Sequence, residues 1–494
     1  MLGAKAKCLQ THAKVSLEDL VPLDNFYRQL EAKLDLSFVR ELVRDYYCSG
    51  NGRPSIDPVV FFKLQLIMFF EGIRSERQLM ETVALHLAHR WYIGYDLGER
   101  VPDHSSLSKI RDRYGLEVFQ RFFEQIVQCC VEAGLVWGQE LYFDGTRVRA
   151  NADIDRQVPR FYWDAQQHVQ TLFSQTTVQE QEAQPSSSET QSAPRSLVEK
   201  YDGTRLVDHE PYYERLADGW VNTTDPSATP LMPNGQERYK LGYHDHYVVD
   251  GGKARIILAA LVTPASIHDP TPMLDLARWV RFRWHLSPKI AVGDGRYGTM
   301  TNIVGVEQDG MRAYLTRPDH RSRTGVYPQS DFAYDPNQDC YLCPQGQRLP
   351  RSSSDARKGV TIYRAPAKVC KHCPVKPQCT KGRYGRVIQR LPFQEVVDRA
   401  GSYLETEGYQ KAMRKRMVWI EPLFGEAKQW HHLGQFRLRG LHKVNMEALL
   451  IASGQNLKRL VRAKQRPQPG TPVTAALRLA VPLKFFACLS LILG

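Results

Sequence analysis

The chain has 494 residues, of which 42% are hydrophobic and 24% are charged. This length and composition exclude a fibrous or wholly disordered protein and predict about three globular domains. Lys and Arg outnumber Asp and Glu by 66 to 53, which gives a formal net charge of +13. Such an excess favours a polyanionic partner, although charge alone does not distinguish DNA from RNA or an anionic membrane.

The sequence contains no apolar run of about 18 residues, the length that a membrane-spanning helix needs. The segment from Ala480 to Leu493 is apolar but short and contains Lys484, and the segment from Met1 to Val15 lacks the apolar centre of a signal peptide. The ten cysteines are dilute except for one cluster, which fits reduced thiols and a metal. We therefore expect a cytoplasmic protein with no membrane partner.

The first part of the chain, residues 15–137, is predicted to be helical. Asp57 and Pro58 form a helix start, with an N-cap residue before a proline at the first helical position. Apolar residues at helical spacing predict helices over residues 59–72, 75–88, 107–114 and 116–133. Three basic residues are expected to be exposed and to place one helix on DNA: Lys109, Arg111 and Arg113. A helical dimerisation or packing domain fits the pattern equally well.

Residues 138–317 have the pattern of an α/β domain, and we expect a mixed sheet flanked by helices. Predicted strands cover residues 141–144, 146–149, 289–292 and 312–315, and predicted helices cover 270–284 and 301–308. Asp250-Gly251-Gly252 between two apolar segments predicts a hairpin. Gln, Glu, Ser, Thr and Pro dominate a flexible insertion at about 176–196.

A cysteine cluster lies in the loop-rich segment 318–385. Its spacing predicts zinc bound by two CxxC pairs, Cys340 with Cys343 and Cys370 with Cys373. Cys379 and His372 are substitute ligands. Because four thiolates leave no open coordination position, we expect a structural Zn²⁺ in a small zinc-ribbon-like insertion.

Two acidic residues follow apolar strands of the α/β region. Asp144 and Asp294 each come after such a strand and before a glycine. Asp-Gly is also a strong turn signal, so each residue taken alone is equally well explained by a turn. Strand ends in an α/β layer are where sites form, and two carboxylates there bind hard cations such as Mg²⁺.

A third pattern lies in a basic helical region near the C-terminus. Glu421 and Lys428 are seven residues apart and share one helical face, and Pro422 fits a helix that begins at Glu421. A solvated charged helix is the simpler explanation of this segment taken alone. The stretch from Lys411 to Arg466 has thirteen basic and three acidic residues, a formal charge of +10. The net charge of this one region is therefore nearly as large as that of the whole chain, +13.

Together these residues resemble the DDE transposases of bacterial insertion sequences, which have a ribonuclease-H-like catalytic core. The resemblance covers roughly residues 15–465. It rests on Gly52 to Tyr114, Tyr142 to Thr146, Thr224 to Pro226, Gly242-Tyr243, Val249-Asp250, Glu421-Pro422-x-Phe424-Gly425-x-x-Lys428, Arg437-x-Arg439-Gly440 and Asn456 to Lys458. The cysteine segment resembles an insertion found in one subgroup of the family.

The resemblance implies a function and assigns residues to it. It implies that Asp144, Asp294 and Glu421 bind two Mg²⁺ or Mn²⁺ ions, cut the ends of the transposon and join them to target DNA. It further implies that DNA is held by Arg416, Lys428, Arg437, Arg439 and Lys443. The N-terminal helices would bind the terminal inverted repeats, and pairing of two ends implies a homo-oligomer in a nucleoid-associated complex.

Several alternatives stay open. Glu426 competes with Glu421 as the third acid, whereas Asp225, Asp250 and Asp269 lie in turn or cap contexts and are left out. Arg416 is separated from Glu421 by four residues, where the family signature has three. A divalent-metal nuclease or resolvase on the same core, or an inactive DNA-binding derivative, would retain much of the pattern.

The sequence thus predicts five segments: a helical DNA-binding domain (15–137), a first core part (138–317), a cysteine-rich insertion (318–385), a helical second core part (386–466), and a linker with an apolar tail (467–494).

Overall fold

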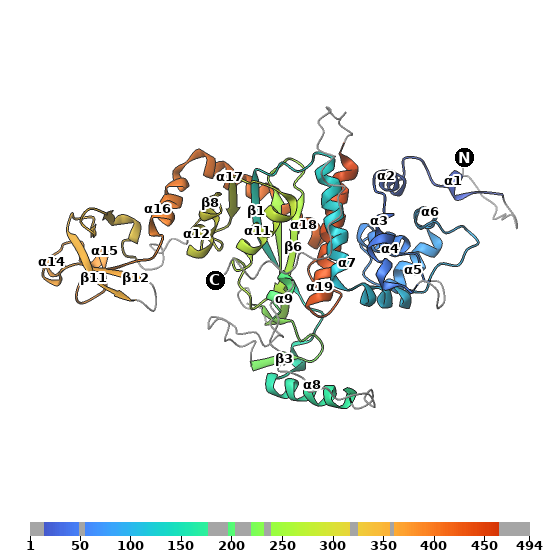
Figure 1. Ribbon diagram of the computed structural model, residues 1–494, viewed down its shortest axis with the longest axis horizontal. Helices are drawn as coiled ribbons and strands as arrows, with labels where there is room; N and C mark the ends of the chain where they lie inside the picture. Colours follow the sequence, from blue (N-terminus) through green and yellow to red (C-terminus); the bar gives the residue numbers. More distant parts are fainter. Residues whose placement is uncertain are drawn as a thin grey trace, which may run out of the picture.

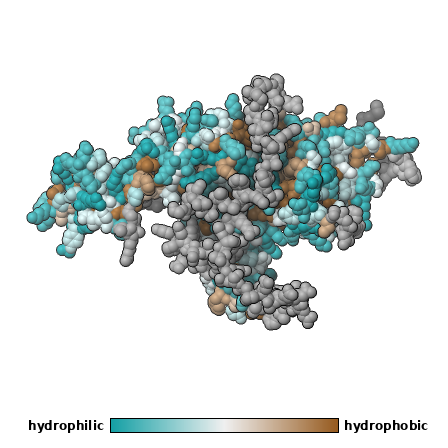
Figure 2. Space-filling view, viewed as in Figure 1, coloured by the Kyte–Doolittle hydropathy of each residue, from teal (hydrophilic) through white to brown (hydrophobic). Residues whose placement is uncertain are grey.

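The computed structural model describes residues 14–48, 55–175, 196–202, 219–231, 239–316, 325–355 and 360–463. The predicted tail at 467–494 and nearly all of the predicted insertion at 176–196 lie outside these ranges. A central sheet has the N-terminal helices on one side and the cysteine-rich strands on the other (Figure 1). The face in Figure 2 is largely hydrophilic, with only small hydrophobic patches. In the described part of the chain, no helix has the length and apolar character needed to cross a membrane.

The N-terminal part is helical, as predicted. Its helices are α1 (Leu17–Leu20), α2 (Phe26–Lys33), α3 (Phe38–Leu42), α4 (Pro58–Phe70), α5 (Glu76–Leu85), α6 (Leu87–Ile93) and α7 (His104–Glu132). Asp57 caps α4 by accepting the Val59 N–H at 2.8 Å. The helix predicted over 75–88 is instead two helices, because His86 has an extended backbone. The two helices predicted on either side of residue 115 form α7, which kinks at Gly115 with φ 64°.

The central sheet is mixed. Its strands are β1 (Glu140–Arg149), β4 (Thr229–Leu231), β5 (Lys240–Asp250), β6 (Ile257–Pro264), β7 (Ile290–Gly293) and β8 (Arg312–Leu315). The order is β4-β5-β1-β7-β8, and β6 also pairs with β5. Strand β5 runs antiparallel to β1 and β6, whereas β7 runs parallel to β1 and β8. The α/β class and the hairpin of β5 and β6 are therefore confirmed.

One strand differs from its prediction. The two strands expected on either side of Asp144-Gly145 form a single strand, β1, so this dipeptide makes no turn. The reason is pairing: β5 continues alongside β1 from Leu141 as far as Arg149 and keeps the backbone extended. Asp144 therefore lies within a strand.

Five helices flank the sheet: α11 (Met273–Trp284), α12 (Met300–Gln308), α17 (Glu407–Trp419), α18 (Glu421–Trp430) and α19 (Leu441–Arg462). Helix α19 packs against α7 and strand β6 (Figure 1). Asn445 and Asn456 of α19 accept backbone N–H groups of β6 at 2.8 and 2.9 Å. Gly454 lets α4 approach closely, because a Cβ there would lie 2.2 Å from the Phe69 ring. Helix α19 thus joins the N-terminal helices to the sheet.

The cysteine-rich segment has its own sheet and core. Strands β9 (Ala333–Asp335), β10 (Cys340–Leu342), β11 (Arg348–Asp355), β12 (Val360–Arg364) and β13 (Val387–Arg390) are antiparallel and adjacent in chain order. Their core is formed by Phe332, Tyr341, Leu349, Tyr363, Ala365 and Ile388. Helices α14 (Ala367–Lys371) and α15 (Lys376–Cys379) precede β13, and α16 (Gln394–Ser402) follows it.

The remaining elements are short or peripheral. Strands β2 (Gln157–Pro159) and β3 (Trp220–Asn222) pair beside α8 (Arg160–Gln175), and α9 (Leu197–Lys200) contacts β6 and α19. Single 3₁₀ turns cover Arg44–Tyr46, Ile154–Arg156, Gln329–Asp331 and Tyr403–Glu405.

Candidate active site

Asp144 and Asp294 are brought together by the parallel pairing of β1 and β7. The register aligns Tyr142 with Val292, so each acid lies two residues beyond an aligned pair. Strand β7 ends at Gly293, and Asp294 then accepts the Arg296 N–H at 2.8 Å. Strand β1 continues beyond its pairing with β7, and Asp144 lies in that part of β1.

Glu421 joins these two acids from helix α18. Pro422 is at the start of that helix, as predicted, and Glu421 is its first residue. Arg416, in the last turn of α17, lies among all three carboxylates. Its guanidinium nitrogens are 3.0 Å from an oxygen of Asp144, 3.9 Å from one of Asp294 and 3.6 Å from one of Glu421.

Burial differs among the members of this cluster. Arg416 is 10% exposed and Asp144 13%, whereas Glu421 is 54% exposed. Burial raises the pKa of Asp144 to about 6 and Asp294 adds to the rise, while Arg416 and the Gly145 N–H oppose it. The site is therefore a partly buried group of three acids whose negative charge is partly offset by one arginine.

Glu426, the competing third acid, points elsewhere. Its carboxylate is 3.0 Å from the Lys458 ammonium and 3.3 Å from the Arg459 guanidinium. Although burial raises the pKa of Glu426, its interactions with His431 and Lys458 and the charge of Arg459 hold it well below its usual range. Of the two glutamates, Glu421 is the one beside Asp144 and Asp294.

Lys428 faces the site from the same helix as Glu421. Burial lowers the pKa of the Lys428 ammonium, whereas the nearby carboxylates of Asp245 and Asp144 raise it. Asp245 was missed by sequence reasoning. It is fully buried in β5, neither carboxylate oxygen has a hydrogen-bond partner, and burial raises its pKa well above the ordinary value. The signal for it was the polar run His244-Asp245-His246 in a strand whose neighbours are apolar.

The three acids left out of the sequence prediction have structural partners. Asp225 accepts the Tyr243 hydroxyl at 2.6 Å and the Gly440 N–H at 3.0 Å. Asp250 accepts three backbone N–H groups at the start of β1 and in its own hairpin. Asp269 contacts His244 and Arg296. Their exclusion from the site agrees with these contacts.

The donor chemistry of the acid cluster fits a divalent cation. Throughout the described ranges, no group of three or more His, Cys, Asp or Glu side chains is arranged to hold a metal ion. At the acid cluster, the Arg416 guanidinium lies among the carboxylates. Three carboxylates that already surround a cation provide the hard oxygen ligands that Mg²⁺ prefers.

The cysteines lie at the edge of the small second core. Cys343, Cys370 and Cys379 pack against it, whereas Cys340, although buried, does not. Burial raises the pKa of the Cys379 thiol; Arg386 lowers it, and Cys370, Cys343 and Cys373 raise it further. The thiols are thus near one another, without forming an arranged metal site among the described residues.

The predicted DNA-binding residues Arg437, Arg439 and Lys443 all have protein partners. Arg437 is 3.3 Å from Glu76 of α5, and Lys443 is 2.7 Å from Asp112 of α7. Arg439 donates to the Asn151 carbonyl at 2.8 Å. These residues join the C-terminal region to the N-terminal helices and to the segment after β1.

Arg111 was expected to be exposed, but it is buried against Glu76. The prediction was wrong because the helix spacing did not reveal that α5 packs against that face of α7. Lys109 and Arg113 are exposed, as predicted.

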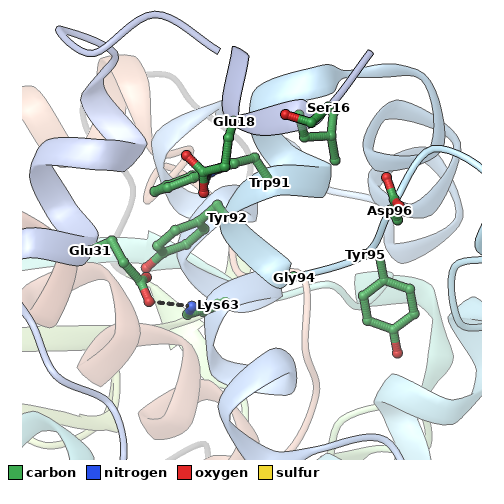
Figure 3. A pocket seen from close by; sticks show the side chains of 10 residues that line it. Ser16, Glu18, Glu31, Lys63, Trp91, Tyr92, Gly94, Tyr95 and Asp96 are labelled. Carbon is green, nitrogen blue, oxygen red and sulfur yellow. Dashed lines mark hydrogen bonds and ion pairs between the residues drawn. The ribbon is translucent and has the colours of Figure 1, made fainter. Parts of the chain in front are cut away.

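A pocket of about 410 Å³ opens among the N-terminal helices (Figure 3). Glu18, Glu31 and Asp96 are in its lining, and Lys63 pairs with Glu31 at 2.8 Å. Because the pocket carries three acids and its lysine is neutralised, it does not suit a phosphate group.

Two protein-family models match parts of the chain. A family model described as Transposase domain (DUF772) matches residues 15–113, and one described as Transposase DDE domain matches residues 342–461. Searches of curated proteins and of solved structures returned no significant match. The first match covers the N-terminal helices, and the second includes Arg416, Glu421 and Lys428. Two stretches of the chain are therefore similar to transposase domain families, and its resemblance to the DDE transposases of insertion sequences is confirmed.

Proposed function

We propose that the chain catalyses metal-dependent cleavage of DNA strands at transposon ends and their transfer to target DNA. The observation that carries this proposal is the convergence of Asp144, Asp294 and Glu421, from three separate elements, on the Arg416 guanidinium. A ribonuclease-H-like core is part of the proposal. The mixed sheet with flanking helices supports it, because its parallel pair β1 and β7 brings two of the acids side by side.

The three carboxylates would hold Mg²⁺ or Mn²⁺, which when bound supplies an activated water or 3′-hydroxyl and stabilises the leaving oxygen. Asp144 lies deepest and fixes one side of the site, while Glu421 closes it from the more exposed side. Lys428, whose pKa is lowered by burial but raised by the charges of Asp245 and Asp144, would contact a DNA phosphate near the acids. Arg416, Arg439 and Lys443 would provide further phosphate contacts, whereas Arg437 pairs with Glu76 inside the protein.

Three further parts of the proposal concern partners and zinc. The DNA partners are the terminal inverted repeats, held by the N-terminal helices, and the target. Pairing of two ends would require a homo-oligomer. A structural Zn²⁺ would be held by Cys343, Cys370 and Cys373, with Cys340 or Cys379 as the fourth thiolate; the grouping of thiols around Cys379 supports this.

The test is cleavage of a donor plasmid that carries the flanking terminal repeats. We expect Asp144→Ala, Asp294→Ala and Glu421→Ala each to reduce cleavage at least about 100-fold, because each removes a ligand of the catalytic cation. Glu426→Ala is the control for the third acid: it should retain activity at a temperature where thermal unfolding shows the variant to be folded, because loss of its pairs with Lys458 and Arg459 lowers stability. Equal cleavage by all variants would refute the catalytic assignment, and loss in Glu426→Ala alone would transfer the third role to that residue.

A second assay separates the proposal from a nuclease or resolvase on the same core. A labelled oligonucleotide with a 3′-hydroxyl terminal-repeat end should become joined to a target plasmid. Cleavage without joining would favour the nuclease. An inactive DNA-binding derivative would bind the repeats but neither cleave nor join them.

A further inference from the structure

Arg416 occupies the position among the acids that a catalytic cation requires. Its guanidinium contacts Asp144, Asp294 and Glu421 through two different nitrogens, Nη1 and Nη2. The side chain is 10% exposed, and its third nitrogen, Nε, is buried without a hydrogen-bond partner. The arginine is therefore held mainly by the carboxylates rather than by other groups around it.

Like charges explain why a cation is needed there before any metal binds. Three carboxylates close together repel one another, and partial burial strengthens the repulsion because it reduces screening by water. An arginine side chain keeps its positive charge at any physiological pH, so it relieves the repulsion permanently. It also occupies oxygen atoms that a divalent cation has to contact.

Release of the acids requires movement of the Arg416 side chain. Arg416 is in the last turn of α17, where its carbonyl oxygen accepts the Ile420 N–H at 3.1 Å. Since the side chain makes the ion pairs with the acids, a change of its rotamer would release them while the helix backbone keeps its hydrogen bond. A released guanidinium presents a planar fork of donors, the geometry that suits a phosphate group.

We propose that Arg416 is a positioning residue that holds the three carboxylates together in the metal-free protein and competes with the divalent cation for them. A DNA phosphate then draws the guanidinium away, so that DNA and metal each strengthen the binding of the other. This inference rests on the proposed function, since it assumes that the three acids bind the catalytic cation. It adds a means by which metal loading depends on DNA.

The test measures binding of Mn²⁺ alone to the full chain by isothermal titration calorimetry. Arg416→Gln should bind Mn²⁺ about tenfold more tightly than the wild type, because no internal cation has to be displaced. Arg414→Gln is the matched control: it makes the same change in charge on an exposed residue of the same helix and should leave the affinity unchanged. Equal or weaker binding by Arg416→Gln would overturn the proposal.

A second measurement addresses folding and the link to DNA. Metal-free Arg416→Gln should have a lower melting temperature than the wild type, and Mn²⁺ should raise it more. Should this variant not fold, Arg416→Lys keeps the charge but loses the fork, and it should bind Mn²⁺ with intermediate affinity. A duplex oligonucleotide should tighten Mn²⁺ binding severalfold in the wild type and leave it unchanged in Arg416→Gln.

Failure of this inference and failure of the proposed function give different results. If only the inference is wrong, Mn²⁺ affinity is the same in wild type and Arg416→Gln, and plasmid cleavage still depends on the three acids. If the proposed function is wrong, Asp144→Ala, Asp294→Ala and Glu421→Ala cleave as the wild type does.

Discussion

Asp245 is a fully buried acid in β5 whose ionisation is disfavoured by its surroundings. It has no hydrogen-bond partner for either oxygen, and burial raises its pKa well above the ordinary value despite the nearby Lys428. A carboxyl group in this position prefers the neutral form. Because its folded pKa is above its unfolded value of about 3.8, the group favours folding at low pH and loses that contribution as the pH rises.

We therefore expect Asp245→Asn, which is neutral and of the same shape, to raise the melting temperature at pH 8 and to leave it unchanged at pH 4. Thermal unfolding at a series of pH values would measure this, with the exposed Asp164→Asn as a control that has no effect at either pH. A loss of stability at pH 8 would instead mean that Asp245 is ionised and paired with Lys428.

At the scale of single residues, the sequence allowed the acids of the site to be predicted, but not the residues that surround them. Asp144, Asp294 and Glu421 were recognised from strand and helix contexts, and the structure brings all three together. The position of Arg416 among them was not predictable, because it depends on how α17 packs against strands β7 and β8, which lie far earlier in the chain. Asp245 was overlooked because nothing in a strand pattern reveals which polar side chain lacks a partner.

At the scale of elements, Glu426 holds three helices together. It lies in α18 and pairs with Lys458 and Arg459 of α19, while His431 accepts from Lys458 at 2.9 Å and donates to the Phe69 carbonyl of α4 at 2.9 Å. Since its folded pKa is depressed, Glu426 stabilises the fold fully above its unfolded value of about 4.5 and less as the pH falls.

Glu426→Gln should therefore lower the free energy of unfolding by about 1–3 kcal/mol at pH 7, because two cations lose their partner. The difference from the wild type should shrink as the pH is lowered below 4.5. Urea unfolding across this pH range is the measurement, and the exposed Glu81→Gln serves as the control. A difference that stays constant with pH would mean that the charge of Glu426 is unimportant.

The cysteine-rich element gives a separate prediction about zinc. Cys379 is near Cys343, Cys370 and Cys373, whereas Cys340 lies outside the core against which Cys343, Cys370 and Cys379 pack. We expect metal analysis of the purified chain to find about one equivalent of Zn²⁺. Cys379→Ala should lose it and Cys340→Ala should retain it. The reverse result would restore the two CxxC pairs as ligands, and absence of zinc from the wild type would exclude the site.

Most helices and strands were predictable because they follow local rules: caps, apolar spacing and turn residues. The expected α4, α11 and α12 and the β5–β6 hairpin all lie close to their predicted ranges. The errors occurred where contacts between distant segments determine the local conformation or the exposure of a side chain. Strand β5 keeps Asp144-Gly145 extended although the dipeptide favours a turn, and α5 buries Arg111 although the helix pattern left it exposed. A single sequence contains no direct record of such pairings.

At the scale of the whole molecule, two ion pairs join the basic C-terminal region to the N-terminal helices. Arg437 is 22% exposed and faces Glu76, which is itself nearly buried and also binds Arg111. Lys443 and Asp112 are 44% and 54% exposed. An exposed pair contributes little to stability, whereas loss of a partly buried partner leaves an unpaired charge. Arg437 is thus needed for the stability of the fold. Lys443, by contrast, can leave Asp112 and contact a DNA phosphate with little loss of stability.

This difference separates the two residues experimentally. Arg437→Gln should reduce the free energy of unfolding by about 1–3 kcal/mol, whereas Lys443→Gln should change it by less than about 0.5 kcal/mol. Lys443→Gln should lower the slope of log affinity against log salt concentration by about 1 for a terminal-repeat duplex, because one phosphate contact is lost. Urea unfolding and DNA binding at several salt concentrations measure both effects. If Lys443→Gln leaves the salt slope unchanged, its pairing with Asp112 persists on DNA, and the basic stretch serves to join the helices rather than to bind phosphate.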